Sequence, residues 1–331
     1  MKNDKDPMKP VAWLRLVVAT VLAAGALCPL QALAQDPPRT YWKYLSDADA
    51  VPLLYQSISG NSNPFDPAHV VTPNATFDAT MAIMAYAHTF SLFDRSAVGT
   101  IMLPMGRLSG GVSGSPVIET ASGFGDPMLE LNVNVLGPPA QKTIPDMNRY
   151  EPGFSVDMVF DLAVPIGEYD NTKPLNIGQN RWYGRVGAPI VWQLGAWVPG
   201  RRTTLEFVPA VWLFGPNNDF VGKTLKTDPM VQFDAHLTRD LYERAWGSFD
   251  VYSITGGGST IDGVSGKKLS TRSLGLTLGF QVNDNMNLSF SYKSTIGDKA
   301  PDDLRMDMFM LTLVVGWHPI LEGSKRLQGE K

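Results

Sequence analysis

Hydrophobic and polar residues alternate along most of this chain with a period of two. In residues 124–136, for example, Leu129 and Leu131 fall on one face, and Glu130 and Asn132 fall on the other. Such alternation indicates strands with one apolar face, whereas a helix would show a period near 3.6. Eleven segments of this kind are predicted, at about 77–90, 95–104, 124–136, 153–165, 181–195, 202–214, 228–238, 246–256, 271–281, 286–295 and 307–317.

The connections between these segments alternate between short and long. Short ones lie at 91–94, 196–201, 239–245 and 282–285, and longer ones, rich in Gly, Asn and Asp, at 105–123, 166–180, 215–227, 257–270 and 296–306. Outer-membrane barrels have this asymmetry, with short periplasmic turns and long outer loops. A further strand must then precede the first segment, and residues 51–58 supply it, for a total of about twelve. The connection 137–152 is long where the pattern requires a short one.

Alternation alone suits either a soluble β-sandwich, with its polar face outside, or a membrane barrel, with its polar face in the lumen. The predicted strands exceed the roughly 5–6 residues usual in globular sheets and approach the roughly 9–11 that cross a bilayer. Aromatic residues at the strand ends suggest two interfacial girdles: Phe90, Trp192, Trp197, Trp246, Phe280 and Trp317 at the periplasmic side, and Trp182, Trp212 and Phe214 at the outer side. We therefore predict an all-β fold, a closed antiparallel up-and-down transmembrane β-barrel, with the sandwich as the alternative.

Residues 1–34 have the features of a cleaved signal peptide. A basic start precedes an apolar stretch, and Ala32-Leu33-Ala34 provides a cleavage site after Ala34. The only cysteine of the chain, Cys28, lies in this segment, and the bulky Leu27 before it argues against a lipoprotein site. The mature chain is then exported without disulfides.

The predicted organisation of the mature chain follows from these boundaries. Residues 35–50 form a short periplasmic segment, too short for a separate plug domain, residues 51–317 form the barrel, and residues 318–331 form a polar periplasmic tail. The expected location is the outer membrane of a Gram-negative bacterium. Expected partners are outer-membrane lipid and the barrel-assembly machinery, which would recognise a final strand ending in an aromatic residue such as Trp317.

Strand parity predicts which polar side chains face the lumen. If Trp182 faces lipid, then Arg181 faces inward, because arginine on the lipid face would cost about 2–4 kcal/mol at mid-depth. The predicted lumen residues are Asp126, Glu130, Asn132, Asn134, Asp157, Asp161, Arg181, Arg185, Asp250 and Lys293, with Glu206, Asp234 and His236 on strands of ambiguous parity. These charges either line a selective pore or pair with one another and close the lumen. The long loop 105–123 is the predicted constriction.

Three clusters of turn residues carry a family resemblance. They are Gly123-Phe124-Gly125-Asp126-Pro127, Pro165-Ile166-Gly167-Glu168-Tyr169-Asp170, and Asn176-Ile177-Gly178-Gln179-Asn180-Arg181-Trp182. In this order and spacing they resemble the outer-membrane transporter family named after the meta pathway of phenol degradation. The resemblance implies a barrel that passes small, often aromatic, compounds, and it implies no catalytic residues.

Signals for other functions are weak. The net charge of −4 gives no support for nucleic-acid binding. The segment Gly111–Ser115 misses the last glycine of the nucleophile elbow, and no histidine has a partner at metal-ligand spacing. We therefore predict a non-enzymatic channel without metal or cofactor, for passive or facilitated diffusion of a small organic permeant. A closed structural barrel and a lipid-modifying enzyme are the alternatives.

Overall fold

The computed structural model describes residues 36–297, 300–319 and 321, so the predicted signal peptide and nearly all of the predicted tail lie outside it. The described chain is almost entirely strand. The strands are β1 (Asp49–Gly60), β2 (Ala75–Leu92), β3 (Arg95–Val112), β4 (Glu119–Phe124), β5 (Met128–Leu136), β6 (Phe154–Ala163), β7 (Tyr183–Gly187), β8 (Ile190–Gln193), β9 (Thr203–Phe214), β10 (Asn217–Phe220), β11 (Lys223–Thr227), β12 (Met230–Tyr242), β13 (Ala245–Gly256), β14 (Ser259–Ile261), β15 (Val264–Ser265), β16 (Leu269–Asn283), β17 (Met286–Ile296) and β18 (Met306–Trp317).

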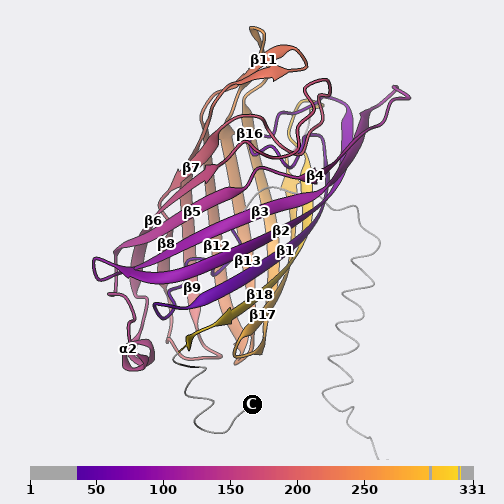
Figure 1. Cartoon of the computed structure of the whole chain (residues 1–331). Helices are drawn as coiled ribbons and strands as arrows, with labels where there is room; N and C mark the ends of the chain where they lie inside the picture. Colours follow the sequence, from indigo (N-terminus) through magenta and orange to yellow (C-terminus); the bar gives the residue numbers. More distant parts are fainter. Residues whose placement is uncertain (1–35, 298–299, 320, 322–331) are drawn as a thin grey trace, which may run out of the picture.

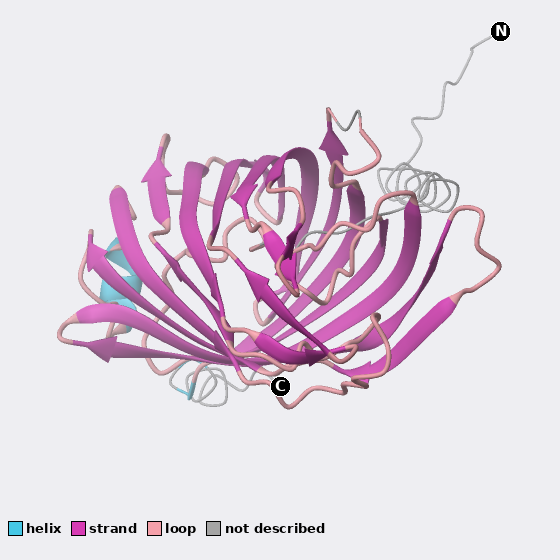
Figure 2. Ribbon diagram, turned by 90° about the horizontal axis from the view of Figure 1, so that it is seen from above, coloured by secondary structure: helices cyan, strands magenta, loops and turns pink. Residues whose placement is uncertain are grey.

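The main sheet closes on itself. The first strand, β1, pairs with β2 on one side and with β18 on the other, and the latter ladder runs from Asp49↔Trp317 to Gly60↔Met306. β4 pairs with β3 in line with β5, and β7 and β8 form one wall strand interrupted at 188–189, which leaves a twelve-strand antiparallel barrel. This confirms the predicted fold class. The strands line both sides of the outline, with loops between them (Figure 2).

Polar and apolar faces are inverted relative to a soluble protein. On β16, Leu274, Leu276 and Leu278 are exposed, whereas Ser273 and Thr277, on the opposite face, are buried. Neighbouring strands repeat the arrangement, so a continuous apolar surface faces outward and polar side chains face the lumen. A water-soluble sandwich would hide these leucines, so the alternation belongs to a lipid-facing barrel wall.

The two ends of the barrel differ in their connections. Strands β2–β3, β12–β13 and β16–β17 are joined by short turns at one end, which we name the turn end. The long connection 137–152, for which the sequence offered no reason, carries the short helix α2 (Ile144–Arg149), capped by Thr143, at this same end (Figure 1). The opposite end, the loop end, carries a small separate sheet of β10, β11, β14 and β15.

The prediction of a loop at 105–123 is wrong, because these residues form a β-hairpin, and their role as a constriction stays a prediction. β3 continues to Val112 and pairs with β2 over its whole length, and β4 returns alongside it as a hairpin. The hairpin projects beyond the barrel wall, and its tip at 113–118 is fully exposed (Figure 1). The glycine content of this segment suggested a loop, but the ladder between β2 and β3 continues through Gly110 and Gly111.

The aromatic girdles are only partly as expected. Trp182, Trp192 and Trp317 are exposed on the outer surface. Trp212, by contrast, is buried in the lumen, where its indole N–H donates to Gln232 at 2.6 Å. Trp246 and Trp197 also turn inward, where their rings contact the guanidinium groups of Arg39 and Arg202, respectively. Among the described residues, no helix has the length and apolarity needed to span a membrane.

Candidate functional site: the barrel lumen

The N-terminal segment, residues 36–48, lies inside the lumen at the turn end. The sequence placed residues 35–50 in the periplasm and judged them too few for a plug, and this is corrected by their contacts. Lys43 forms an ion pair with Asp157 of β6, and Arg39 pairs with Asp240 of β12 at 2.8 Å. A short segment with turns suffices because a lumen of this width already presents unsatisfied charges at close range.

Glu206 of β9 is the second anchor of this segment. Its carboxylate accepts the backbone N–H of Arg39 and the indole N–H of Trp42, both at 2.9 Å. The guanidinium of Arg39 lies 4.1 Å from the ring centroid of Trp42 and 4.4 Å from that of Trp246. Such contacts between a cation and a desolvated ring reinforce the ion pairs. The segment is therefore fixed by charge, hydrogen bonding and packing together.

A row of side chains crosses the wall at the level of Arg185. The strand register places Glu130, Asp161, Arg185 and Trp212 side by side on β5, β6, β7 and β9. Arg185 bonds Asp161 through Nε, and its Nη1 bonds Asp36 of the N-terminal segment at 2.7 Å. Burial raises the pKa of Asp36, but Arg185, together with Tyr41 and His236, outweighs this and leaves the pKa below its ordinary value.

A second polar cluster occupies the facing wall. His236 of β12 lies 2.8 Å from Asp250 of β13, which also accepts hydrogen bonds from Ser248 and Thr277. The ammonium of Lys293 lies 3.9 Å from the ring centroid of Tyr252. These contacts satisfy most of the buried charge, as burial in a protein interior requires. Among the described residues, no group of three or more His, Cys, Asp or Glu is arranged to hold a metal ion.

The lumen towards the loop end is apolar and rich in methionine. Met306, Met308 and Met310 alternate along the inner face of β18, and each is at most 2% exposed. The amide of Gln56 donates to the sulfur of Met310 at 3.5 Å. Phe65 from the β1–β2 connection and other loop residues pack on this cluster. The lumen therefore has a charged section near the turn end and an apolar section near the loop end.

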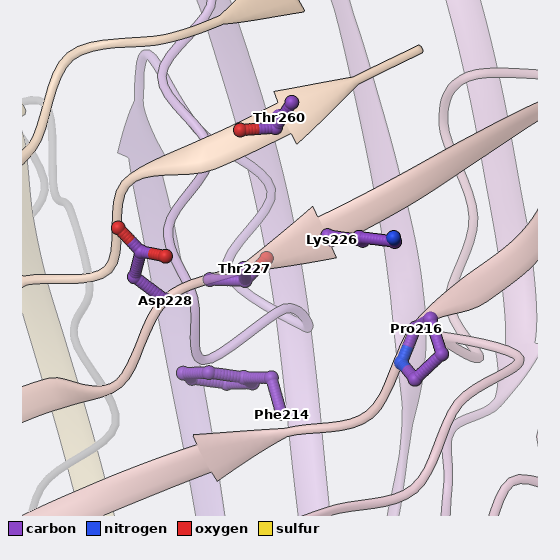
Figure 3. A pocket seen from close by; sticks show the side chains of 6 residues that line it. All are labelled: Phe214, Pro216, Lys226, Thr227, Asp228 and Thr260. Carbon is purple, nitrogen blue, oxygen red and sulfur yellow. The ribbon is translucent and has the colours of Figure 1, made fainter. Parts of the chain in front are cut away.

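Arg181 lies where the apolar section meets the loop end. Its guanidinium bonds both carboxylate oxygens of Asp66, at 2.8 and 2.9 Å, and donates to Thr227 at 2.8 Å. Asp66 belongs to the inward-folded β1–β2 connection, so this pair holds a loop inside the barrel mouth. Next to it is an open pocket of about 320 Å³ (Figure 3), lined by Phe214, Pro216, Lys226, Thr227, Asp228 and Thr260.

The three motif clusters of the sequence meet in one structure at the loop end, which we name the motif knot (residues 123–127, 165–170 and 176–182). Asp126 is at its centre, where its carboxylate accepts the backbone N–H of Gly167 at 2.9 Å and that of Gln179 at 2.8 Å. A side chain at Gly178 would lie 2.6 Å from the backbone of Gly167. Asp126 thus ties loops together, and it does not line an open passage.

The parity assignments agree with the structure for the predicted lumen residues that lie on strands or within the barrel, whereas Asp126 lies in the motif knot, outside the strands. Asn132, Asn134, Asp157, Asp161, Arg181, Arg185, Asp250 and Lys293 are buried within the barrel, as are the ambiguous Glu206, Asp234 and His236. Glu130 is also inward, 4.0 Å from Arg185. Their predicted role in permeation stays a prediction. The sequence suggested that these charges pair with one another. In the structure, many of them also pair with the N-terminal segment or with Asp66.

Sequence reasoning missed Asp36, Arg39, Trp42 and Lys43. A signal was present: Pro37-Pro38 is followed by a dense mixture of cationic and aromatic residues, which is unusual for a solvated linker. The methionines of β18 were also not singled out, although they fall on the face opposite Phe309 and Leu311.

Comparison with known proteins agrees with this architecture. Residues 60–313 match the family model described as "Putative MetA-pathway of phenol degradation". The chain belongs to this family. The match includes the motif knot and the barrel strands from β2 to β17, but only Gly60 of β1, and it ends at residue 313 within β18. The search of curated proteins gave no match.

Several solved structures resemble this member of the family. The COG4313 outer membrane channel from Pseudomonas putida F1 has a TM-score of 0.70 and 18% identity, and the match covers 86% of this chain and 100% of that one. The translocator domain of the autotransporter NalP from Neisseria meningitidis has a TM-score of 0.48 and 12% identity, with 93% and 95% covered. The first likeness supports the shared barrel fold.

Proposed function

We propose that this protein is an outer-membrane channel that passes small organic compounds, aromatic ones among them, by passive or facilitated diffusion. The supporting observation is that two segments outside the barrel strands fold into the lumen and fill it. Residues 36–48 enter from the turn end and the β1–β2 connection enters from the loop end, each held by ion pairs and hydrogen bonds. Such segments can move while the wall stays intact, because every wall strand keeps its ladder.

The division of the lumen suits amphiphilic permeants. A compound entering at the loop end would meet the methionine-rich section, where thioether and aromatic groups accommodate flat apolar rings. It would then meet Arg185 and the charged section, which recognise a polar substituent. The proposal includes export by a signal peptide cleaved after Ala34, insertion by the barrel-assembly machinery, and a surrounding outer-membrane lipid.

A closed structural barrel is the second candidate, and the extensive charge pairing inside the lumen favours it. Single-channel recording of the mature chain, residues 35–331, in a planar bilayer separates the two. The channel predicts discrete conductance steps, partly blocked by added 4-hydroxybenzoate. A barrel that inserts stably but stays silent, also when Arg39→Gln and Lys43→Gln loosen the N-terminal segment, would rule out the channel.

A further inference from the structure

We propose that Asp36 of the N-terminal segment, supported by the hydroxyl of Tyr41, acts as an internal ligand that occupies a binding site for aromatic carboxylates at Arg185. The inference rests on the proposed function and names its substrate class. A free aromatic carboxylate would bind by replacing Asp36 on the guanidinium, and the end of the segment would leave the lumen as it binds.

The groups that the segment presents to Arg185 are a carboxylate and a phenol in contact. Asp36 Oδ2 accepts from Arg185 Nη1 at 2.7 Å and from the hydroxyl of Tyr41 at 2.8 Å, and that hydroxyl lies 3.5 Å from Arg185 Nη2. Both Tyr41 and Arg185 are buried. A hydroxylated aromatic acid carries both functional groups on one ring, and its carboxylate is the group that would take the place of Asp36.

The wall around Arg185 is built for a planar anionic group. The guanidinium carbon lies 5.5 Å from the ring centroid of Trp212, and Tyr183 lies next to that ring, with centroids 6.5 Å apart. Asp161 fixes the guanidinium through Nε, which leaves the Nη atoms directed at the occupant. A fork of two N–H donors beside aromatic faces is a common recognition site for a carboxylate on an aromatic ring.

Charge determines which compounds can exchange with Asp36. Arg185 is the cation of this cluster, and Asp161 and Glu130 lie beside it together with Asp36. The buried guanidinium is therefore surrounded by acidic side chains. An incoming carboxylate replaces Asp36 charge for charge. A neutral phenol or hydrocarbon would leave two buried N–H donors without an acceptor, and sites that hydrogen-bond their ligand discriminate strongly against such analogues.

Local anchoring lets the end of the segment exchange alone. Among the described residues, the hydrogen bonds of the Asp36 side chain go to Arg185 and Tyr41. The segment is held separately at Arg39 and Lys43. Asp36 can therefore swing away about Pro37-Pro38 while these anchors stay in place. An internal ligand that occupies the site most of the time lowers the apparent affinity for a free ligand by the same factor.

The test is calorimetric titration of the detergent-solubilised mature chain with 4-hydroxybenzoate, 4-hydroxybenzamide and acetate. In Asp36→Ala the internal carboxylate is gone, and we expect 4-hydroxybenzoate to bind at least about tenfold more tightly than to the wild-type chain. The matched variant Asp36→Glu keeps a carboxylate and should bind as the wild type does. The amide and acetate should bind at least about tenfold more weakly than 4-hydroxybenzoate to Asp36→Ala.

Equal affinity of Asp36→Ala and wild type for 4-hydroxybenzoate would overturn the inference, as would equal binding of the amide or of acetate. Arg185→Lys, which keeps the charge but loses the fork, should lose the gain caused by Asp36→Ala; retention of that gain would also overturn it. Conductance in KCl is recorded on the same samples. If the barrel conducts but the affinity does not change, the proposed channel function stands and the internal ligand is ruled out. If the affinity changes but the barrel is silent, the internal ligand stands and the channel function is ruled out.

Discussion

The carboxylate of Asp126 accepts a 2.9 Å hydrogen bond from the backbone N–H of Gly167, 41 residues further along the chain. Its other oxygen accepts from Gln179 at 2.8 Å, so one side chain joins the β4–β5 connection to both halves of the β6–β7 connection. The residues that identify the family thus hold loops over the barrel mouth. These residues determine the conformation of the loops, whereas the charged side chains of the lumen lie on the strands and on residues 36–48.

Replacing Asp126 by asparagine should loosen the motif knot. The amide oxygen can accept only one of the two N–H groups, and the new NH₂ group meets the other donor. The expected cost is about 1.5–3 kcal/mol, since a buried hydrogen bond to a charged acceptor is lost. Urea unfolding in lipid vesicles measures it. Asp94→Asn, which changes an exposed carboxylate paired with Lys142, is the control and should be nearly neutral.

Close backbone packing makes a second prediction for the motif knot. In Gly178→Ala the new methyl group would lie 2.6 Å from the carbonyl carbon of Gly167, so the backbone must shift. We expect faster proteolytic cleavage within 165–182 and a loss of about 1–3 kcal/mol, as for other overpacked sites. Gly99→Ala is the control, because its methyl group would have its nearest neighbour at 3.9 Å. Equal cleavage in both variants would show that the knot tolerates the added volume.

The barrel wall could be predicted from sequence because its signal is local. Glu130 faces inward and Leu131 outward because successive side chains of one strand point to opposite faces. The turns between strands are likewise determined by the few residues that form them. The same rule failed at β3, where glycines continue a strand. Glycine weakens a strand because it has no side chain to pack, but its backbone can still pair, and pairing with β2 holds β3 extended here.

The N-terminal segment could not be placed in the same way. Lys43 meets Asp157, and Arg39 meets Glu206, across sequence separations of 114 and 167 residues. No local period encodes such contacts. They arise because a lumen too wide to be filled by its own side chains leaves buried carboxylates that must find a cation. Trp246, by contrast, faces inward because it shares the strand parity of Asp250, and Arg39 then packs on its ring.

Releasing one anchor of the segment should open the channel more often. Lys43 is buried with its partner Asp157, so Lys43→Gln leaves a buried carboxylate without its cation, at a cost of about 3–5 kcal/mol. Moving the segment out lets water reach Asp157, so part of this cost favours the open state. Single-channel recordings should show more frequent or larger conductance steps. Lys142→Gln removes an exposed lysine–aspartate pair and should leave the recordings unchanged.

Acid should release the β1–β2 connection through His69. Burial lowers the pKa of His69 from 6.5 to about 4. Asp66 opposes this shift to a smaller extent, and Lys293 adds to it. The folded loop favours the neutral ring, so the released loop binds more protons between these values. Stability contributed by the neutral ring is therefore complete above pH 6.5 and falls by about 3 kcal/mol as the pH drops to about 4.

Limited proteolysis within 61–74 at pH 4.5 and pH 7.5 measures this release. The wild-type chain should be cleaved faster at the lower pH, and His69→Gln, which cannot titrate, should lose most of that difference. His88→Gln changes a half-exposed histidine on β2 and should keep it. If His69→Gln remained as acid-sensitive as the wild type, other groups would control the loop.

Shortening the β3–β4 hairpin should leave conductance unchanged. Gly110 and Glu119 are paired across the hairpin, so replacing residues 111–118 by Asn-Gly creates a two-residue turn that suits the strand twist. The removed tip is exposed and projects beyond the wall, so its loss neither widens nor narrows the lumen. Single-channel amplitudes of the shortened and full-length chains should coincide in planar bilayers. A larger amplitude would mean that the hairpin folds over the mouth in the membrane, and the constriction would then have to be assigned to it and not to residues 36–48.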